Sequence, residues 1–220
     1  MINIEIKPPK LEYAVEESYK SVRANLLFCG EDKKIITITS CTPNEGKSTV
    51  ALNLAISLAE GGKKVLLIDA DLRKSVLMPR IKATANVDGL AHLLSRQAQV
   101  KDVICSTNIP KLHIIFAGTY PPNPSELLGG KNFKNLLTFA KELYDYVLID
   151  TPPLGSVIDS AIVAEKCDGT ILVVETGGIR YRLAQQVKEQ IEKTKCPILG
   201  AILNKADVES KRYYGKYKKY

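Results

Sequence analysis

Short unbroken runs of apolar residues alternate along this 220-residue chain with longer segments in which apolar residues recur every three or four positions. The short runs are rich in Val and Ile and predict buried strands, whereas the longer spacing predicts helices with one apolar face. Strands are expected at residues 35–40, 65–68, 112–116, 146–150, 169–174 and 197–203. Helices are expected at residues 14–28, 50–60, 87–94, 133–143, 158–166 and 179–195.

This alternation predicts an α/β fold with a mainly parallel sheet and helices on both faces, because strand–helix–strand units form right-handed crossovers. Residues 1–30 are expected to form an N-terminal lead-in followed by a helix. The lead-in, residues 1–12, is expected to be extended or loose because Pro8 and Pro9 block a helix. Residues 31–207 are expected to form one nucleotide-binding domain, and residues 208–220 a disordered tail.

A candidate nucleotide-binding loop lies between the first core strand and its helix. The segment CTPNEGKST, residues 41–49, resembles the phosphate-loop pattern G-x-x-x-x-G-K-[ST], with Cys41 in place of the first glycine. Gly46 lets the backbone approach a phosphate closely. Lys47 is expected to reach the β- and γ-phosphates and Ser48 to bind Mg²⁺, which indicates a P-loop NTPase-like fold. A chance turn is the simpler reading, but the strand before and the helix after favour a nucleotide loop.

Carboxylates follow two of the predicted buried strands. Asp69 and Asp71 come after the strand at 65–68, and Asp150 ends the strand at 146–150. Ligands in open parallel sheets bind at the carboxyl ends of strands, so these side chains are candidates for the site. An acidic residue that ends a strand after a phosphate loop is typical of the second magnesium element in nucleoside-triphosphate enzymes.

The net charge of +7 is unevenly distributed. Residues 209–220 hold five cations and one anion, a sum of +4, so the remaining chain carries only +3. A nearly neutral body argues against a nucleic-acid partner. The five cysteines are scattered without a C-x-x-C pair, which argues against a disulfide framework or zinc site. Neither a leader-like segment nor an apolar span is evident, so a cytoplasmic protein is expected.

Two further segments have a simple and a functional interpretation. In the helix at 14–28, Glu16 and Lys20 are spaced i,i+4, which is typical of a solvated, self-paired face. A charged contact between subunits is the alternative.

Four of the ten tyrosines lie in the last eight residues, namely Tyr213, Tyr214, Tyr217 and Tyr220. By itself this end would suit a basic tail that binds anionic lipid or nucleic acid.

Taken together, these motifs give the chain a family resemblance. It resembles the cytoplasmic tyrosine kinases of Gram-positive bacteria that are linked to capsule and exopolysaccharide synthesis. The resemblance covers nearly the whole chain. It rests on the first nucleotide motif at 43–49, the acidic motif at 66–73, the strand and Asp-Thr-Pro-Pro at 146–153, the PPNPSELL loop at 121–128, and the terminal tyrosines.

The resemblance implies an ATP- and Mg²⁺-dependent protein-tyrosine kinase that phosphorylates its own tail. It implies a transmembrane polysaccharide co-polymerase as activating partner, which recruits the kinase to the inner face of the membrane. It also implies a homo-oligomer, in the form of a ring, and other protein-tyrosine substrates. A phosphotyrosine phosphatase would reverse the reaction. Such kinases control the length or export of surface polysaccharide.

Kinase chemistry then assigns roles to individual residues. Asp150 is expected to hold Mg²⁺ directly or through water, with help from Asp71. Asp69 is expected to take the proton from the acceptor tyrosine, although Asp69 and Asp71 could exchange roles. Arg73 is expected to counter the charge of a phosphate or of a neighbouring subunit. The expected nucleotide-binding residues are Asn44, Glu45, Gly46, Lys47, Ser48, Thr49 and Asn204. Of these, Thr49 is expected near the α-phosphate and Asn204 near the base.

The chain departs from the family pattern at two places. Asn44 replaces a usual glycine, and Asn is the residue other than glycine that best tolerates a positive φ. The assembly motif E-x-x-R-x-x-R reads here as Glu17, Lys20 and Arg23. Lys20 keeps the charge but loses the bidentate fork of arginine, so weaker ring assembly is expected.

Three other classes of protein compete with the kinase interpretation. Asn204 begins an N-K-x-D segment like the guanine motif of GTPase switches, but the acidic motif and the tyrosine tail argue against that class. Partitioning or division-site ATPases carry an extra lysine early in the loop, where Thr42 stands here, and an amphipathic tail. Related iron–sulfur scaffold ATPases require the missing C-x-x-C pair. The third class, after the GTPases and the ATPases, is a non-enzymatic adaptor in which the bound nucleotide only switches the binding of a partner.

Overall fold

The computed structural model describes residues 2–7, 10–81 and 87–206. The four terminal tyrosines and the expected tail at 208–220 lie outside these residues. Within the described ranges, every helix is either too short or too polar to cross a bilayer.

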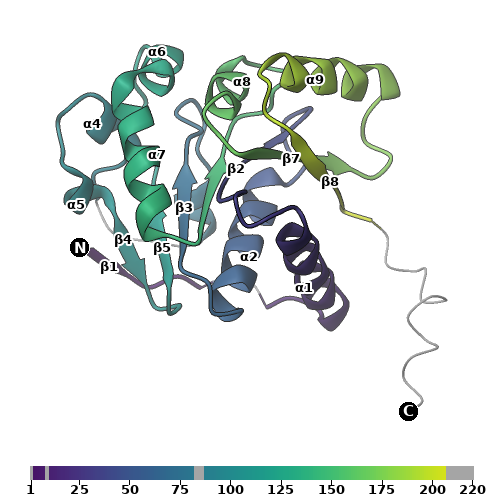
Figure 1. Cartoon of the computed structure of the whole chain (residues 1–220), viewed down its shortest axis with the longest axis horizontal. Coiled ribbons are helices and arrows are strands. Elements are labelled where there is room, and N and C mark those ends of the chain that lie inside the picture. The colour runs from purple at the N-terminus through teal and green to yellow at the C-terminus, as the bar shows by residue number, and fades with distance from the viewer. Residues whose placement is uncertain (1, 8–9, 82–86, 207–220) are drawn as a thin grey trace.

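The strands of the described residues form one eight-stranded sheet in the order β1-β4-β5-β3-β6-β2-β7-β8 (Figure 1). Neighbouring strands run parallel except β4 and β5, which are antiparallel. The expected α/β fold with a mainly parallel sheet is confirmed. The strands are β1 Ile2–Ile4, β2 Ile35–Ser40, β3 Val65–Asp69, β4 Cys105–Thr107, β5 Leu112–Ile115, β6 Tyr146–Asp150, β7 Gly169–Glu175 and β8 Ile198–Asn204.

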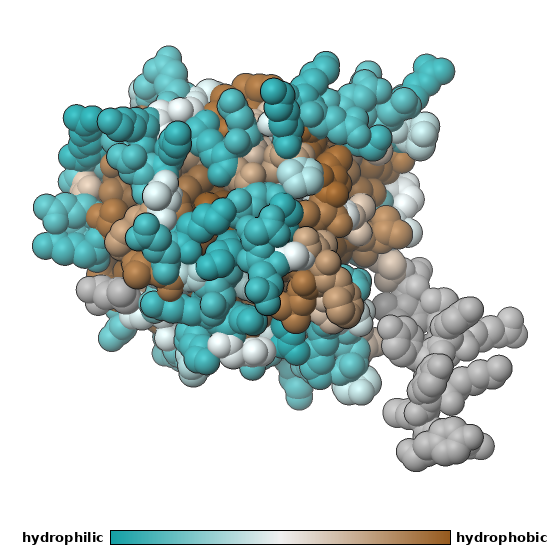
Figure 2. Space-filling view, viewed as in Figure 1, coloured by the Kyte–Doolittle hydropathy of each residue, from teal (hydrophilic) through white to brown (hydrophobic). Residues whose placement is uncertain are grey.

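Helices cover both faces of this sheet (Figure 1). The helices α1 and α2 share one apolar cluster with the sheet, and α4, α6, α7 and α8 share another. The helices are α1 Tyr13–Phe28, α2 Lys47–Glu60, α3 Leu77–Arg80, α4 Leu90–Leu94, α5 Val100–Val103, α6 Pro124–Gly129, α7 Lys131–Leu143, α8 Asp159–Ala164 and α9 Tyr181–Lys193. Figure 2 shows polar side chains over most of one face, with apolar groups between them.

The unbroken apolar runs of the central strands are explained by their burial on both faces. In β3, Val65 and Leu67 join the cluster beneath α1 and α2, whereas Leu66 and Ile68 join the cluster beneath α4 and α7. Successive side chains of a strand point to opposite faces, so a strand that is covered twice needs apolar residues at every position. The polar residue comes only where the strand ends, at Asp69.

The N-terminal lead-in is extended at residues 2–4, one of the two expected alternatives, but its pairing with β4 as the edge strand β1 was not predicted. Ile4 and Ile6 are buried in the main core cluster, so packing holds this segment. The strand β4 and the helices α3 and α5 were also not predicted. Each has only three or four residues, too few for a periodic pattern to show.

The start of α2 and the cap of α6 also need comment. The helix α2 begins at Lys47, not at residue 50, because its first turn is the polar phosphate loop. By residue type, Ser125 or Asn123 could cap the short turn after the proline-rich loop. Among the described contacts of α6, Asn123 makes no side-chain cap, and it donates to Glu126 instead. The hydroxyl of Ser125 donates to Asp159, so Ser125 has a tertiary partner, whereas the partner of Asn123 lies within α6.

Candidate functional site

The loop between β2 and α2 has the backbone conformation that a phosphate site requires. Asn44 and Gly46 both have a positive φ, 69° and 89°, so the expected tolerance of Asn44 is confirmed. Gly46 stands at the N-cap of α2, where unpaired backbone N–H groups and the helix dipole favour an anion. A Cβ at Gly46 would lie 2.1 Å from Asn204 Nδ2, so only glycine fits.

Hydrogen bonds of Glu45 hold this loop in place. The Glu45 carboxylate is only 1% exposed. It accepts the Thr42 amide at 2.7 Å and the Glu175 amide at 3.3 Å. Asn204 Nδ2 donates to the Glu45 carbonyl at 2.8 Å. Asn204 therefore braces the loop in this structure, a role that its place in the sequence did not reveal, and its contact with a base stays a prediction.

Lys47 and the predicted carboxylates meet at the carboxyl ends of β3 and β6. These two strands are neighbours, and Asp69 and Asp150 occupy paired positions in them. Lys47 Nζ lies 3.3 Å from Asp71 Oδ2 and 3.6 Å from Asp150 Oδ1. It also lies 3.3 Å from Ser48 Oγ. The structure thus brings together residues that are up to about a hundred positions apart in sequence.

Burial controls the charge of this cluster. It raises the pKa of Asp69 to about 8, and the charge of Asp150 adds to that shift. Burial also raises the pKa of Asp150, although Lys47 opposes the change. For Lys47, burial works against the charged form, but Asp150 and Asp71 outweigh it and hold its pKa above the ordinary value.

The loop after β3 fixes the two acidic side chains differently. Asp69 accepts a hydrogen bond from Ser75 Oγ at 2.5 Å and one from the Asp71 amide at 3.2 Å. Asp71 Oδ1 accepts the backbone amides of Arg73 at 3.3 Å and Lys74 at 2.9 Å. Ser75 was not predicted as part of the site, because nothing in the sequence distinguishes it from an ordinary loop serine.

Arg73 points away from this cluster. Its guanidinium binds Asp159 at the start of α8, with Nε–Oδ2 at 2.7 Å and Nη2–Oδ1 at 3.0 Å. Its Nη2 also donates to Ser125 Oγ at 3.1 Å. In this structure the charge that Arg73 counters is therefore that of Asp159. A role toward a phosphate or a neighbouring subunit stays a prediction.

The cluster has the chemistry of a magnesium site. Three carboxylates face one ammonium group, so the ionised cluster has an excess negative charge. Within the described part of the chain, Asp150 Oδ1 is a buried oxygen without a hydrogen-bond partner. No group of three or more His, Cys, Asp or Glu residues in those ranges is placed to bind a metal alone. Mg²⁺ commonly takes only one or two protein carboxylates, with phosphates and water completing its shell.

One residue at the mouth of the loop was missed. Arg80, in α3, donates a hydrogen bond from Nη1 to Thr49 Oγ1. Thr49 lies in the first turn of α2 and was expected near the α-phosphate. No motif marked Arg80 in the sequence. It follows the acidic motif by seven positions, and only the folded chain places it beside Thr49.

The expected assembly residues divide between two environments. Glu17 and Lys20 form an exposed ion pair with each other at 2.6 Å. Arg23 Nη1 instead donates to the Ser57 carbonyl of α2 at 2.5 Å. A Cβ at Gly61 would lie 2.7 Å from the Arg23 guanidinium, so Arg23 fills the space at the end of α2. Arg23 thus packs against α2 and takes no part in the exposed pair of Glu17 and Lys20.

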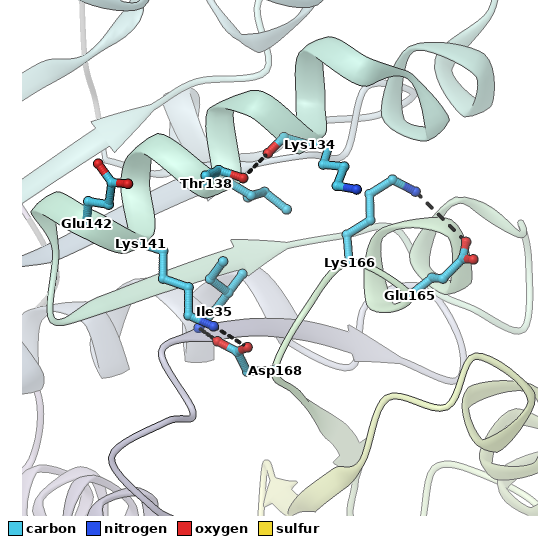
Figure 3. Close-up of a pocket in the computed structure, with 9 residues that line it drawn as sticks. Ile35, Lys134, Thr138, Lys141, Glu142, Glu165, Lys166 and Asp168 are labelled. Carbon is cyan, nitrogen blue, oxygen red and sulfur yellow. Dashed lines mark hydrogen bonds and ion pairs between the residues drawn. The ribbon is translucent and has the colours of Figure 1, made fainter.

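A separate pocket of about 540 Å³ lies at the amino ends of β2 and β7, opposite the acidic cluster (Figure 3). There Asp168 pairs with Lys141 at 2.6 Å and accepts the amides of Lys34 and Ile35. These contacts tie α7 to the strand ends. The pocket contains none of the predicted site residues.

Comparison with known proteins agrees with this geometry. Residues 33–198 match the family model described as the AAA domain. The chain is 44% identical over 222 residues to tyrosine-protein kinase CpsD of Streptococcus agalactiae, with 100% of this chain and 96% of that protein covered. It is 39% identical to tyrosine-protein kinase YwqD of Bacillus subtilis strain 168, with 91% of this chain and 85% of that protein covered.

Solved structures give the same result. The crystal structure of the chimerical protein CapA2B2 has a TM-score of 0.84, 32% identity, and 94% of each chain covered. The septum site-determining protein MinD of Pyrococcus horikoshii, complexed with Mg-ADP, has a TM-score of 0.65 and 26% identity, with 77% and 69% covered. The division-site ATPases therefore share the fold, but the similarity to the tyrosine kinases is greater in both sequence and structure.

Proposed function

Because this chain belongs to the capsule- and exopolysaccharide-linked tyrosine kinases of Gram-positive bacteria, we propose that it transfers the γ-phosphoryl group of ATP to tyrosines of its own C-terminal cluster. The chain is a protein-tyrosine kinase with a nucleotide-binding AAA domain. The observation that carries the proposal is the meeting of Lys47, Asp71 and Asp150 within 3.6 Å at the phosphate loop. Phosphoryl transfer depends mainly on such positioning and charge.

The binding roles follow from the contacts. Gly46 and the first turn of α2 supply backbone N–H groups to the phosphates, and Lys47 exchanges its carboxylate partners for the β- and γ-phosphates. Ser48, Asp71 and Asp150 would hold Mg²⁺, which neutralises phosphate charge and orients the transferred group. The Mg-ADP complex of MinD, a protein of the same fold, supports a magnesium–nucleotide ligand here.

We assign proton removal to Asp69. The acceptor tyrosine loses its O–H proton as its oxygen bonds to the γ-phosphorus and the bond to the ADP oxygen breaks. A pKa raised to about 8 makes the ionised carboxylate of Asp69 a stronger base than that of an ordinary aspartate. The Ser75 hydroxyl holds one oxygen of Asp69 and keeps the carboxylate in place.

The partners are inferred from the family. A transmembrane polysaccharide co-polymerase would activate the kinase and recruit it to the inner face of the membrane, and a phosphotyrosine phosphatase would reset it. Glu17, Lys20 and Arg23 would bridge subunits of a ring. Arg23 must first leave Ser57 to do so, which fits the weaker assembly expected for this variant of the motif.

Incubation with ATP followed by an anti-phosphotyrosine blot tests the proposal. We expect a signal that requires Mg²⁺, because EDTA removes the cation that the acidic cluster needs. A chain with phenylalanine at all four terminal tyrosine positions is the control and should give little signal. ATP hydrolysis without phosphotyrosine would instead favour the partitioning or division-site class.

We further predict that the transfer occurs between subunits. Fifteen residues follow Lys205, and fully extended they reach about 50 Å, enough to approach a neighbour's site. The +4 charge of residues 209–220 suits an acidic cluster. Four phosphates of about −1.5 to −2 each would reverse that charge and repel the tail, which loosens the assembly.

A mixing experiment measures this directly. A Lys47→Met chain with its tail is mixed with an active chain truncated after Ser210. Phosphate should appear on Tyr213, Tyr214, Tyr217 or Tyr220 of the inactive chain. Transfer within one chain is the correct model if the inactive chain stays unlabelled, wild type labels itself at a rate independent of its concentration, and no oligomer forms.

A further inference from the structure

Asp159 is a buried carboxylate outside every motif assigned above. It is 0% exposed and opens α8, nine residues after Asp150. Arg73 binds both of its oxygens, and Ser125 Oγ donates to Oδ1 at 2.7 Å. Burial works against the charged form, but the hydrogen bonds from Arg73 and Ser125 and the charge of Arg73 together outweigh it, so the pKa of Asp159 lies below its ordinary value.

These contacts join three segments of the chain through three mutually bonded side chains. Arg73 comes from the acidic loop after β3, Ser125 from the first turn of α6, and Asp159 from the segment after β6. Each member contacts the other two, because Arg73 Nη2 also donates to Ser125 Oγ at 3.1 Å. The acidic motif, the PPNPSELL segment and the segment that follows Asp150 are thus joined at one ionised group.

These contacts continue directly to the acidic cluster. The backbone amide of Arg73 donates to Asp71 Oδ1, and the other oxygen, Asp71 Oδ2, accepts a hydrogen bond from Lys47. Asp159 binds the side chain of Arg73, and the backbone of Arg73 orients the Asp71 carboxylate. Groups that orient a metal-binding carboxylate from behind commonly change metal affinity as strongly as some ligands do.

We propose that Asp159 and Ser125 are positioning residues for the magnesium–nucleotide site. They hold the Arg73 side chain, and through the Arg73 backbone they fix Asp71 with Oδ2 available to the cation. This inference rests on the proposed role of Asp71 in binding magnesium. A clamp that serves only stability is the alternative, and a buried ion pair does not by itself show which role applies.

The test uses Asp159→Asn, which keeps the shape of the side chain but removes its charge. Titration calorimetry measures the dissociation constants of ADP with Mg²⁺ and of ADP in EDTA. We expect the Mg²⁺-dependent affinity to fall about 10- to 100-fold, while the affinity in EDTA stays near wild type. Thermal unfolding without nucleotide shows separately how much stability is lost.

Asp168→Asn is the matched control. Asp168 also pairs with a cation and accepts backbone amides, but it does so at the opposite end of the sheet (Figure 3). Its variant should lose stability without any change in the effect of Mg²⁺ on ADP affinity. Ser125→Ala is the milder second variant if Asp159→Asn does not fold, and Ser125→Thr should restore the affinity.

A double-mutant cycle then connects Asp159 to Asp71. If Asp159 acts through Asp71, Asp159→Asn should weaken Mg-ADP binding no further in a chain that already carries Asp71→Asn. Three results would overturn the inference. The first is that the two substitutions weaken Mg-ADP binding additively. The second is that Asp159→Asn weakens ADP binding equally with Mg²⁺ and in EDTA, and the third is that Asp159→Asn leaves the affinity for Mg-ADP unchanged. If Asp71→Asn itself has no effect, the proposed magnesium role of Asp71 fails as well.

Discussion

Replacing Lys47 with methionine is expected to abolish phosphotyrosine formation. Lys47 Nζ is the cation nearest to both Asp71 and Asp150 among the described contacts. In the reaction it would stabilise charge that develops on the transferred phosphate. Loss of one such group typically lowers the rate about 100- to 1,000-fold. The initial rate of autophosphorylation with saturating Mg-ATP is the quantity to measure.

The same replacement leaves two buried carboxylates without their cation, so stability needs its own control. Lys47→Arg keeps the charge but changes its geometry, and it should retain more stability than Lys47→Met while losing most activity. Lys141→Met removes the partner of Asp168 at the far end of the sheet and should remain active. A Lys47→Met chain that folds and gives wild-type phosphotyrosine would contradict the assignment.

Asp69→Asn is expected to lower the rate of phosphoryl transfer about 100- to 10,000-fold, because asparagine cannot accept the tyrosine proton. Nucleotide affinity should change little, since Asp69 lies beside the proposed magnesium residues rather than among them. Asp145→Asn is the control. Asp145 accepts the Lys64 amide at 2.7 Å near the start of β6, and its loss should leave the rate unchanged.

Stability gives an independent measure of Asp69 through its pH dependence. The pKa is about 8 in the folded chain and about 4 in an unfolded one. Between these values the folded state binds more protons than the unfolded state. The free energy of unfolding therefore falls as pH rises from about 4 to 8. Asp69→Asn should flatten this slope in urea titrations at several pH values. An unchanged slope would show that Asp69 is ionised in the fold, and full activity of the variant would exclude it as the base.

The assembly and tail proposals depend on residues that the fold treats differently. Glu17 and Lys20 are exposed and paired with each other, so they can exchange partners at little cost. Arg23 holds the C-terminal turn of α2, whose N-terminus is the phosphate loop. The terminal tyrosines lie outside the described residues, and their use stays a prediction.

The local sequence determined the architecture and most of the site. Continuous apolar runs predicted the central strands because those strands are buried on both faces, as β3 shows. The placement of Asp69, Asp71 and Asp150 after parallel strands predicted that they would gather at one edge. The segment from Pro43 to Thr49 predicted the phosphate loop because its glycine and lysine chemistry is local. Short edge strands such as β1 gave no comparable signal, since tertiary packing alone holds them.

Only the tertiary structure decided which partners the polar side chains take. Asn204 donates to the Glu45 carbonyl, Arg73 binds Asp159, and Arg23 donates to the Ser57 carbonyl of α2. The sequence did not reveal these partners, and the expected contacts of Asn204 with a base and of Arg73 with a phosphate or a neighbouring subunit stay predictions. Ser75, Arg80 and Asp159 carried no sequence signal at all. A hydrogen bond depends on which distant loop the fold brings within about 3 Å, and periodicity and motif spacing contain no information about that distance.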